Sequence, residues 1–216
     1  MGLGGWWWIT NSLKESYPRP QAGHNARTSH WQNTPYLNMP YTIEHHKHIS
    51  SAWGAATGAR ASKLCRFKVS VGREILEAVG FTAKFLVTDL PTPARLDARH
   101  AQWRRKVIQK AKQKKLSFTH GIAAKLINSY LKDRFVCGGN HQHPRVKCLH
   151  PPIDAVLLDA LAKANFGGCA KEWRNFHNKR WSKFDSKTYQ GVINLIRCTL
   201  PGEPLWKIEQ HWKGNQ

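Results

Sequence analysis

A chain of 216 residues, 41% of them hydrophobic, can bury one sizeable core, so we expect one domain with at most a small appendage. Its 34 lysines and arginines face 13 acidic residues, and the formal net charge is +21. That charge attracts polyanions and favours nucleic acid as the partner, although a ribosomal, anionic-membrane or simply soluble basic protein is the alternative. No apolar run approaches the roughly eighteen residues that a membrane-spanning helix needs, so we predict no membrane span.

Aromatic residues and cysteines add two indications. Ten Trp, five Tyr and eight Phe lie among the basic residues, as stacking on bases requires, although an ordinary core uses the same residues. The five cysteines are odd in number and widely spaced, and no basic region precedes the apolar patch near the N-terminus as it does in a signal peptide. We therefore expect reduced thiols and a cytoplasmic location.

Residues 1–40 show no sustained hydrophobic period and contain one acidic residue, Glu15. We predict a disordered or loosely docked arm here, followed by a single helical domain over residues 41–216. Met39 offers an alternative native start, in which case the arm would not belong to the native chain. A basic arm that lies along nucleic acid is the rival interpretation.

Three helices are predicted before the middle of the chain. Apolar residues recur at helical spacing over 42–61, although Gly54 and Gly58 weaken the helix. The small residues Gly54, Ala55, Gly58 and Ala59 allow another helix to approach closely. Ser70 caps a second helix, which runs through Val79 and ends at Gly80. A third, strongly basic helix covers residues 94–115. Its charges either face water or follow nucleic-acid phosphates, and we predict that these residues bind nucleic acid: Arg104, Arg105, Lys110, Lys112, Lys114 and Lys115.

The next helix follows a turn over residues 117–121 and runs to about Phe135. Its buried face combines two rows with a spacing of four residues, Ile122-Leu126-Tyr130 and Ala123-Ile127-Leu131-Phe135. Lys125, Ser129 and Lys132 fall on the opposite, polar side. Lys125 therefore lies near the helix start and faces either a cleft or bulk water.

A loop over residues 137–148 contains residues that bind zinc in other proteins: Cys137, His141, His143 and Cys148, with His150 shortly after. Their spacing matches no standard zinc motif. We therefore predict a basic connecting loop and no metal, and keep a small zinc-stabilised helical protein as an alternative.

The remaining segments are also predicted to be helical. Pro151-Pro152 opens a helix with Asp154 at or near its N-cap and with these residues packing inward: Val156, Leu157, Ala160, Leu161 and Ala164. Gly167-Gly168 ends it. A basic aromatic segment over 169–181 precedes a helix that either Ser182 or Asp185 caps, and residues 203–212 form a last short amphipathic segment. No alternating strand pattern is sustained, so the predicted fold class is all-α.

Lys125 and Asp154 suggest a chemistry if the fold brings the two helix starts together. A lysine amine that has lost its proton attacks electrophilic carbon and forms a Schiff base, and burial or a neighbouring cation such as Lys132 favours the neutral amine. A carboxylate opposite stabilises positive charge on a deoxyribose ring, as in glycosyl transfer. The simpler interpretation is a solvated lysine on a basic helix and an aspartate that only caps a helix.

The residues around this pair resemble the helix-hairpin-helix DNA glycosylases. Gly121 stands four residues before Lys125, as a glycine does before their catalytic lysine, and Pro152-Ile153-Asp154-Ala155 is similar to the signature that carries their catalytic aspartate. The nearest branch is the 8-oxoguanine glycosylases, including the compact archaeal type. The resemblance implies a two-lobed all-α domain, a Schiff-base role for Lys125 with Asp154 as its partner, and a flipped base between the lobes.

The same resemblance implies a hairpin that holds a DNA phosphate through backbone N–H groups. Together with Lys132, this adds His120, Gly121 and Ala123 to the predicted nucleic-acid-binding residues. We therefore predict a glycosylase/lyase that acts on double-stranded DNA without a cofactor, and the alternative is a nucleic-acid-binding helical protein that keeps the fold without catalysis. Several segments between His48 and Trp212 are also similar to a set of bacterial proteins of unassigned activity, which supports one folded unit from about Tyr41.

Overall fold

The computed structural model describes residues 41–60, 62 and 65–212, and the chain from Tyr41 onward forms one compact unit. Every regular element among these residues is helical, which confirms the all-α prediction. The arm predicted for residues 1–40 lies outside the described residues. The α-helices are α1 (Ile43–Arg60), α2 (Val69–Ala78), α3 (Leu96–Gln113), α4 (His120–Leu131), α5 (Pro144–Lys147), α6 (Ala155–Lys163), α7 (Ala170–Lys179) and α8 (Ser186–Thr199).

Shorter helical segments connect these helices. The 3₁₀ segments are η1 (Val87–Asp89), η2 (Pro93–Arg95), η4 (Phe166–Gly168), η5 (Trp181–Lys183) and η6 (Leu205–His211). The helix predicted to run to about Phe135 ends as an α-helix at Leu131 and continues as a wider π-helical segment, η3 (Lys132–Asn140). Gly139 kinks η3, because its φ of 93° lies in the left-handed region that glycine adopts readily.

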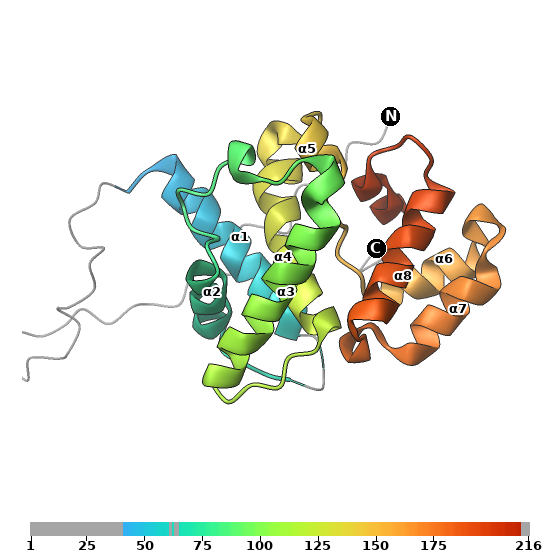
Figure 1. Cartoon of the computed structure of the whole chain (residues 1–216), viewed down its shortest axis with the longest axis horizontal. Coiled ribbons are helices and arrows are strands. Elements are labelled where there is room, and N and C mark those ends of the chain that lie inside the picture. The colour runs from blue at the N-terminus through green and yellow to red at the C-terminus, as the bar shows by residue number, and fades with distance from the viewer. Residues whose placement is uncertain (1–40, 61, 63–64, 213–216) are drawn as a thin grey trace, which may run out of the picture. The chain divides into compact units, whose positions relative to one another are not determined.

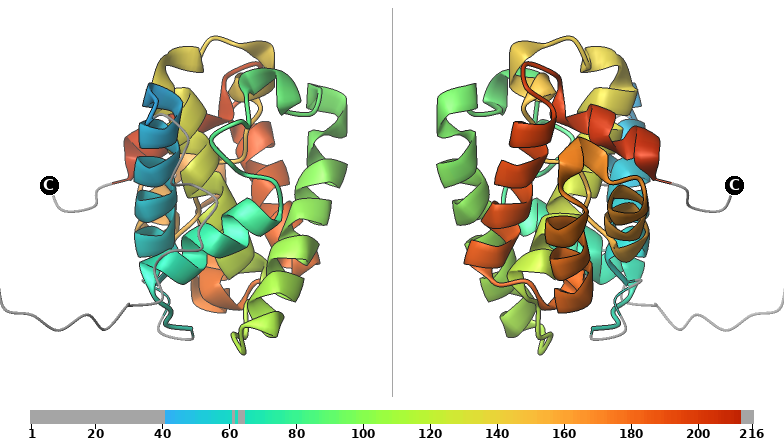
Figure 2. Two further views of the ribbon diagram at one scale, coloured as in Figure 1. Left: turned by 90° about the vertical axis from the view of Figure 1, so that its left-hand side faces the viewer. Right: turned by 90° about the vertical axis from the view of Figure 1, so that its right-hand side faces the viewer.

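Helix α4 is the centre of the unit. It lies between α1 and α3 and also contacts α8 and η5 (Figures 1 and 2). Both predicted rows of its buried face are confirmed, since all of their residues are at most 4% exposed. The C-terminal helices α6, α7 and α8 gather on one side of α4 (Figure 1).

Small residues bring α1 close to its neighbours. Ala52, Ala55, Ala56 and Ala59 are buried along one face of α1, which packs on α4 and α2. At the α2 contact, a Cβ added to Gly72 would lie 2.6 Å from the Cβ of Ala56. The close helix approach predicted from the small residues of this segment is therefore confirmed at Ala55 and Ala59, whereas a Cβ on Gly54 would have no neighbour within 4 Å.

Two details of the C-terminal part differ from the sequence prediction. Val156 is 43% exposed and Ala164 is also exposed, because the buried face of α6 consists of Leu157, Leu158, Leu161 and Ala162 and the two exposed residues lie outside it. The N-cap of α8 is Asp185, which accepts a hydrogen bond from the Thr188 amide, so the choice that the sequence left open is decided.

None of the described helices is both long enough and apolar enough to cross a membrane.

Candidate active site

Lys125 and Asp154 meet in the structure. The Lys125 Nζ atom lies 2.9 Å from Asp154 Oδ2, and the two side chains are 11% and 17% exposed. Lys125 comes from the second turn of α4, whereas Asp154 precedes the first residue of α6. The juxtaposition predicted from sequence is therefore confirmed, and the pair is largely shielded from water.

Helix capping determines which oxygen of Asp154 faces Lys125. Asp154 is extended, and its Oδ1 accepts a hydrogen bond of 2.9 Å from the Leu157 amide, as an N-cap aspartate does. Oδ2 is thereby directed away from the helix end. It accepts from Lys125 and also from the indole N–H of Trp212, at 3.0 Å.

A cavity of about 370 Å³ surrounds this pair. Its walls come from α1, α4, η3, the segment before α6 and the C-terminal segment. The lining residues are Ser50, Trp53, Gly54, Gly58, Lys125, Ser129, Lys132, Asp133, Pro152, Asp154, Glu209 and Trp212. The volume is within the range of about 300–1,000 Å³ that is usual for small-molecule sites.

Glycine and tryptophan residues shape the wall opposite Asp154. A Cβ added to Gly58 would lie 3.7 Å from Lys125 Cε, an ordinary van der Waals contact, so the lysine side chain lies against α1 at this glycine. Trp53 is exposed and lines the same cavity, as does Trp212. Exposed indole rings at a cavity are suited to stacking on planar groups such as nucleobases.

A larger cavity of about 830 Å³ adjoins the first, because Lys132 and Glu209 line both. Apolar side chains from Val136, Leu200 and Trp206 form much of its wall. The two cavities together offer space for a group larger than a sugar.

Glu209 is a cavity residue that the sequence analysis missed. It forms an ion pair with Lys132, and its side chain is 18% exposed. Burial raises the pKa of Glu209 above its usual range, against the opposing effect of Lys132. No sequence motif surrounds Glu209 in the amphipathic C-terminal segment. Only its contact with Lys132 in the folded protein identifies it as a residue of the cavity.

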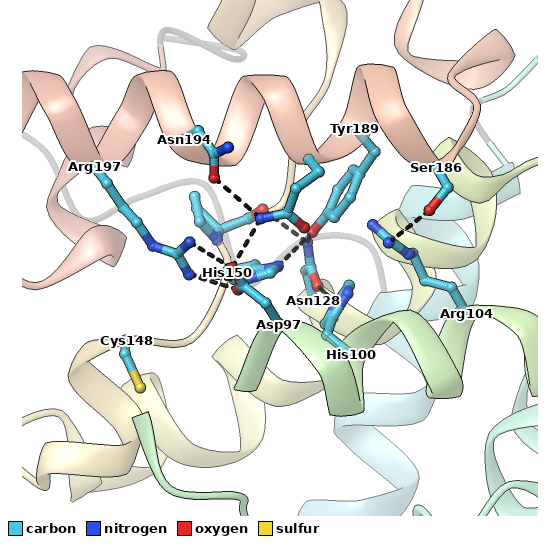
Figure 3. A network of polar contacts seen from close by, with 12 residues as sticks. Asp97, His100, Arg104, Asn128, Cys148, His150, Ser186, Tyr189, Asn194 and Arg197 are labelled. Carbon is cyan, nitrogen blue, oxygen red and sulfur yellow. Dashed lines mark hydrogen bonds and ion pairs between the residues drawn. The ribbon is translucent and has the colours of Figure 1, made fainter. Parts of the chain in front are cut away.

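A buried polar network ties the two halves of the site together (Figure 3). Asn128, one turn after Lys125 on α4, donates 2.9 Å hydrogen bonds to the carbonyl oxygen of Pro151 and to the Tyr189 hydroxyl. Pro151 is three residues before Asp154. Asn128 therefore holds the segment that leads into α6 against the helix that carries Lys125.

The protons in this network follow from its geometry. Because Asn128 Nδ2 donates twice, its Oδ1 accepts from His100 Nε2, at 2.7 Å. Ionised Asp97 can only accept, so His150 Nε2–H donates to it at 2.9 Å, and Nδ1 of the neutral ring accepts from the Tyr189 hydroxyl at 3.0 Å. Both histidines are neutral in this arrangement.

The ionisable groups of the network have shifted pKa values. Burial lowers the pKa of His150, and it lowers the pKa of His100 well below the usual histidine range. Hydrogen bonds from Arg197 and His150 lower the pKa of Asp97 far below its usual range. The network thus favours an ionised Asp97 and uncharged histidines.

These shifts predict that the protein loses stability in mild acid. Below about pH 6.5 the unfolded chain binds protons at His100 and His150 that the folded chain does not, so the free energy of unfolding falls by up to about 1.4 kcal/mol per pH unit for each group. Asp97 adds a further loss below about pH 4. Urea unfolding at pH 7.5, 6.5 and 5.5 measures this slope.

His100→Gln should make the slope shallower, because glutamine keeps a donor for Asn128 without a titrating ring. His46→Gln is the control, since His46 is exposed on α1. Equal slopes in the wild type and His100→Gln would contradict the assignment of this pH dependence to the network.

The predicted basic run of α3 and the following turn is mostly exposed. Arg105, Lys112, Lys114 and Lys115 are exposed, Lys110 is half-buried, and Lys114 forms an ion pair with Glu74. Among the described residues, those of α3 line neither of the two cavities. The run is therefore separate from the Lys125 cavity, whereas Lys132 lies in it.

Three predicted nucleic-acid-binding residues are wrong as surface contacts. Arg104 is 1% exposed, with its guanidinium 4.1 Å from the ring centroid of Tyr189. Gly121 and Ala123 are buried, and their amides donate within the protein, to the carbonyl oxygens of Phe184 and Thr119. Their amides are therefore not available to hold a phosphate.

His120 and the residues weighed as zinc ligands have local surroundings of their own. His120 is half-buried, and burial and the neighbouring arginines lower its pKa. Within the described part of the chain, no three His, Cys, Asp or Glu side chains are grouped as metal ligands. His143 instead caps α5 by accepting from the Arg145 amide, and all five cysteines are free. The zinc alternative thus has no ligand cluster to support it.

The cavity combines a potential nucleophile, Lys125, with a carboxylate that contacts it. An amine next to a carboxylate in a partly enclosed site can form a Schiff base with a carbonyl or sugar carbon. No protein-family model, curated protein or solved structure matches the chain. The assignment of function therefore depends on the chemistry of this cavity.

Proposed function

We propose that the protein is a DNA glycosylase/lyase that excises a flipped, damaged base through a Schiff base on Lys125. The observation that carries the proposal is the 2.9 Å contact between Lys125 Nζ and Asp154 Oδ2 inside a cavity. The resemblance of the Gly121–Lys125 and Pro152–Ala155 segments to helix-hairpin-helix glycosylases supports it. The helical fold agrees with that resemblance, and the two-lobed glycosylase architecture is part of the proposal.

The proposed reaction uses the groups of the cavity in order. After the Lys125 ammonium has lost one proton to solvent, the amine forms a bond from Nζ to C1′ of the deoxyribose while the bond from C1′ to the base breaks and the base takes the electron pair. Asp154 stabilises the positive charge that develops on the sugar. Opening of the sugar ring then leaves a Schiff base, from which the lyase step eliminates the 3′ phosphate.

Net charge supports DNA as the substrate. The formal charge of +21 favours encounter with a polyanion, and exposed Arg105 and Lys112 of α3, with Lys114 and Lys115 just after it, offer positive charge for phosphates. Exposed Trp53 at the Lys125 cavity is suited to stack on a base of the strand that is bound there.

Borohydride trapping tests the proposal. Incubation with a duplex that carries 8-oxoguanine or an abasic site, followed by reduction, should give a covalent protein–DNA complex, and Lys125→Gln should abolish it because glutamine has no nucleophilic amine. Lys163→Gln, at an exposed lysine of α6, is the control and should be trapped like the wild type.

A second candidate is a nucleic-acid-binding protein without catalysis. It is favoured by the internal use of the Gly121 and Ala123 amides, which leaves the exposed charges of α3 as the main contact for phosphates. Salt-sensitive duplex binding that is equal in the wild type and Lys125→Gln, with no trapped complex in either, would support this candidate in place of the enzyme.

A further inference from the structure

The two carboxylates nearest to Lys125 have different surroundings. Asp154 accepts three N–H groups: the Leu157 amide and the Lys125 ammonium at 2.9 Å each, and the Trp212 indole at 3.0 Å. A proton on Oδ2 would displace one of its two donors. Asp154 is therefore placed to remain an acceptor that stabilises a cation.

Glu209 has a different set of contacts. Its Oε2 accepts from Lys132, and no group in the described part of the chain donates to its Oε1. The charged and titratable groups around it are Lys132 of η3, Lys125 of α4, Asp154 before α6, and Cys137. Burial raises its pKa, so that a protonated Glu209 is more accessible near neutral pH than an ordinary glutamic acid.

The position of Glu209 suits a proton donor. It lines both the cavity that holds Lys125 and the larger apolar cavity next to it. A deoxyribose beside Lys125 with its base in the larger cavity would place Glu209 near the bond that joins them. Enzymes that cleave a glycosidic bond usually combine one carboxyl group that donates a proton with a second carboxylate that stabilises the sugar cation.

We propose that Glu209 is the general acid that protonates the departing base, while Asp154 stays ionised beside Lys125. This rests on the proposed function. In the step, the Lys125 amine bonds to C1′, the bond from C1′ to the base nitrogen breaks with its electron pair on the base, and the Glu209 proton moves to the base. Glu209 becomes a carboxylate that Lys132 stabilises, and it regains a proton from the new ammonium on Lys125.

Two duplexes separate this role from that of Lys125: one with 8-oxoguanine opposite cytosine, and one with a preformed abasic site. An acid is needed only while a base departs. Glu209→Gln should therefore slow release of 8-oxoguanine by about 100-fold or more, while its borohydride trapping on the abasic duplex changes by less than about threefold. Glu209→Asp should recover part of the release rate.

Glu172→Gln is the control, because Glu172 is an exposed carboxylate of α7 that lines neither cavity. It should match the wild type on both duplexes. Thermal melting establishes that Glu209→Gln is folded; if it is not, Glu209→Asp is compared on the two duplexes and should be slowed only in base release.

Equal losses on both duplexes, or no loss on either, would overturn the role of Glu209. So would a wild-type protein that is trapped on the abasic duplex but releases no base, although Lys125 would then retain its proposed role. Absence of trapping on both duplexes would overturn the proposed function itself.

Discussion

Asp154→Asn is expected to reduce the rate of Schiff-base trapping by about 100-fold or more while the protein stays folded. Asparagine caps a helix about as well as aspartate, so the hydrogen bond to the Leu157 amide can be kept. What disappears is the negative charge that contacts Lys125 and that would stabilise the cationic sugar. Single-turnover trapping with the 8-oxoguanine duplex, where the base must depart, measures the effect.

The stability change of the same variant should be modest. Removal of one partner from a partly buried ion pair leaves Lys125 uncompensated, which we expect to lower the free energy of unfolding by about 1–2 kcal/mol. Asp154→Ala also removes the cap and should lose about 1 kcal/mol more.

Asp185→Asn is the control for Asp154→Asn, because Asp185 caps α8 in the same way and lines neither cavity. Its trapping rate should equal that of the wild type. A trapping rate for Asp154→Asn that equals that of the wild type would remove Asp154 from the proposed reaction and leave it with a capping role only.

Gly121→Ala is expected to lower the free energy of unfolding by about 3 kcal/mol or more. A Cβ at this position would lie 1.8 Å from the carbonyl oxygen of Trp181 and 3.2 Å from the Cβ of Phe184. The first contact is with backbone, so it cannot be relieved by a side-chain rotation. The start of α4 would have to move away from the η5 turn, and with it the helix that carries Lys125.

The contact between α4 and the η5 region explains this sensitivity. The Gly121 amide donates to the carbonyl oxygen of Phe184 at 3.1 Å, and the Thr119 hydroxyl donates to that of Ser182 at 2.8 Å. Both bonds need the close approach that only glycine permits. Urea unfolding followed by circular dichroism measures the change.

Gly54→Ala provides the comparison for Gly121→Ala. Gly54 is also within a helix, but a Cβ there would have no neighbour within 4 Å, so alanine should stabilise α1 by up to about 1 kcal/mol. If Gly121→Ala were as stable as the wild type, the close contact between α4 and η5 would not exist in solution.

Sequence patterns predicted the elements of the site better than their surroundings. The four-residue spacing in residues 122–135 placed Lys125, Ser129 and Lys132 on one polar face, and all three line the cavity. Pro151-Pro152 followed by Asp154 indicated a helix start, and Asp154 is the N-cap. Both signals are local, because helical period and capping depend on residues a few positions apart.

Burial of polar groups was where sequence-based prediction failed. Arg104 belongs to a charge run that is typical of a solvated face, yet its guanidinium lies over the Tyr189 ring inside the protein. Gly121 matched a phosphate-binding hairpin, yet it serves as a packing residue under Trp181. In both cases the deciding partner is in the η5–α8 region, far along the chain.

The sequence by itself determined the helical class, the Asp154 cap of α6, and the amine and carboxylate available for chemistry, since each depends on local spacing, whereas the Ser70 cap predicted for α2 was wrong because that helix begins at Val69 after Lys68. Only the tertiary structure decided that Trp53, Glu209 and Trp212 share a cavity with Lys125 and Asp154. The physical reason is that contacts between distant segments depend on how whole helices pack. The spacing of residues within one segment does not show which other segment it will contact.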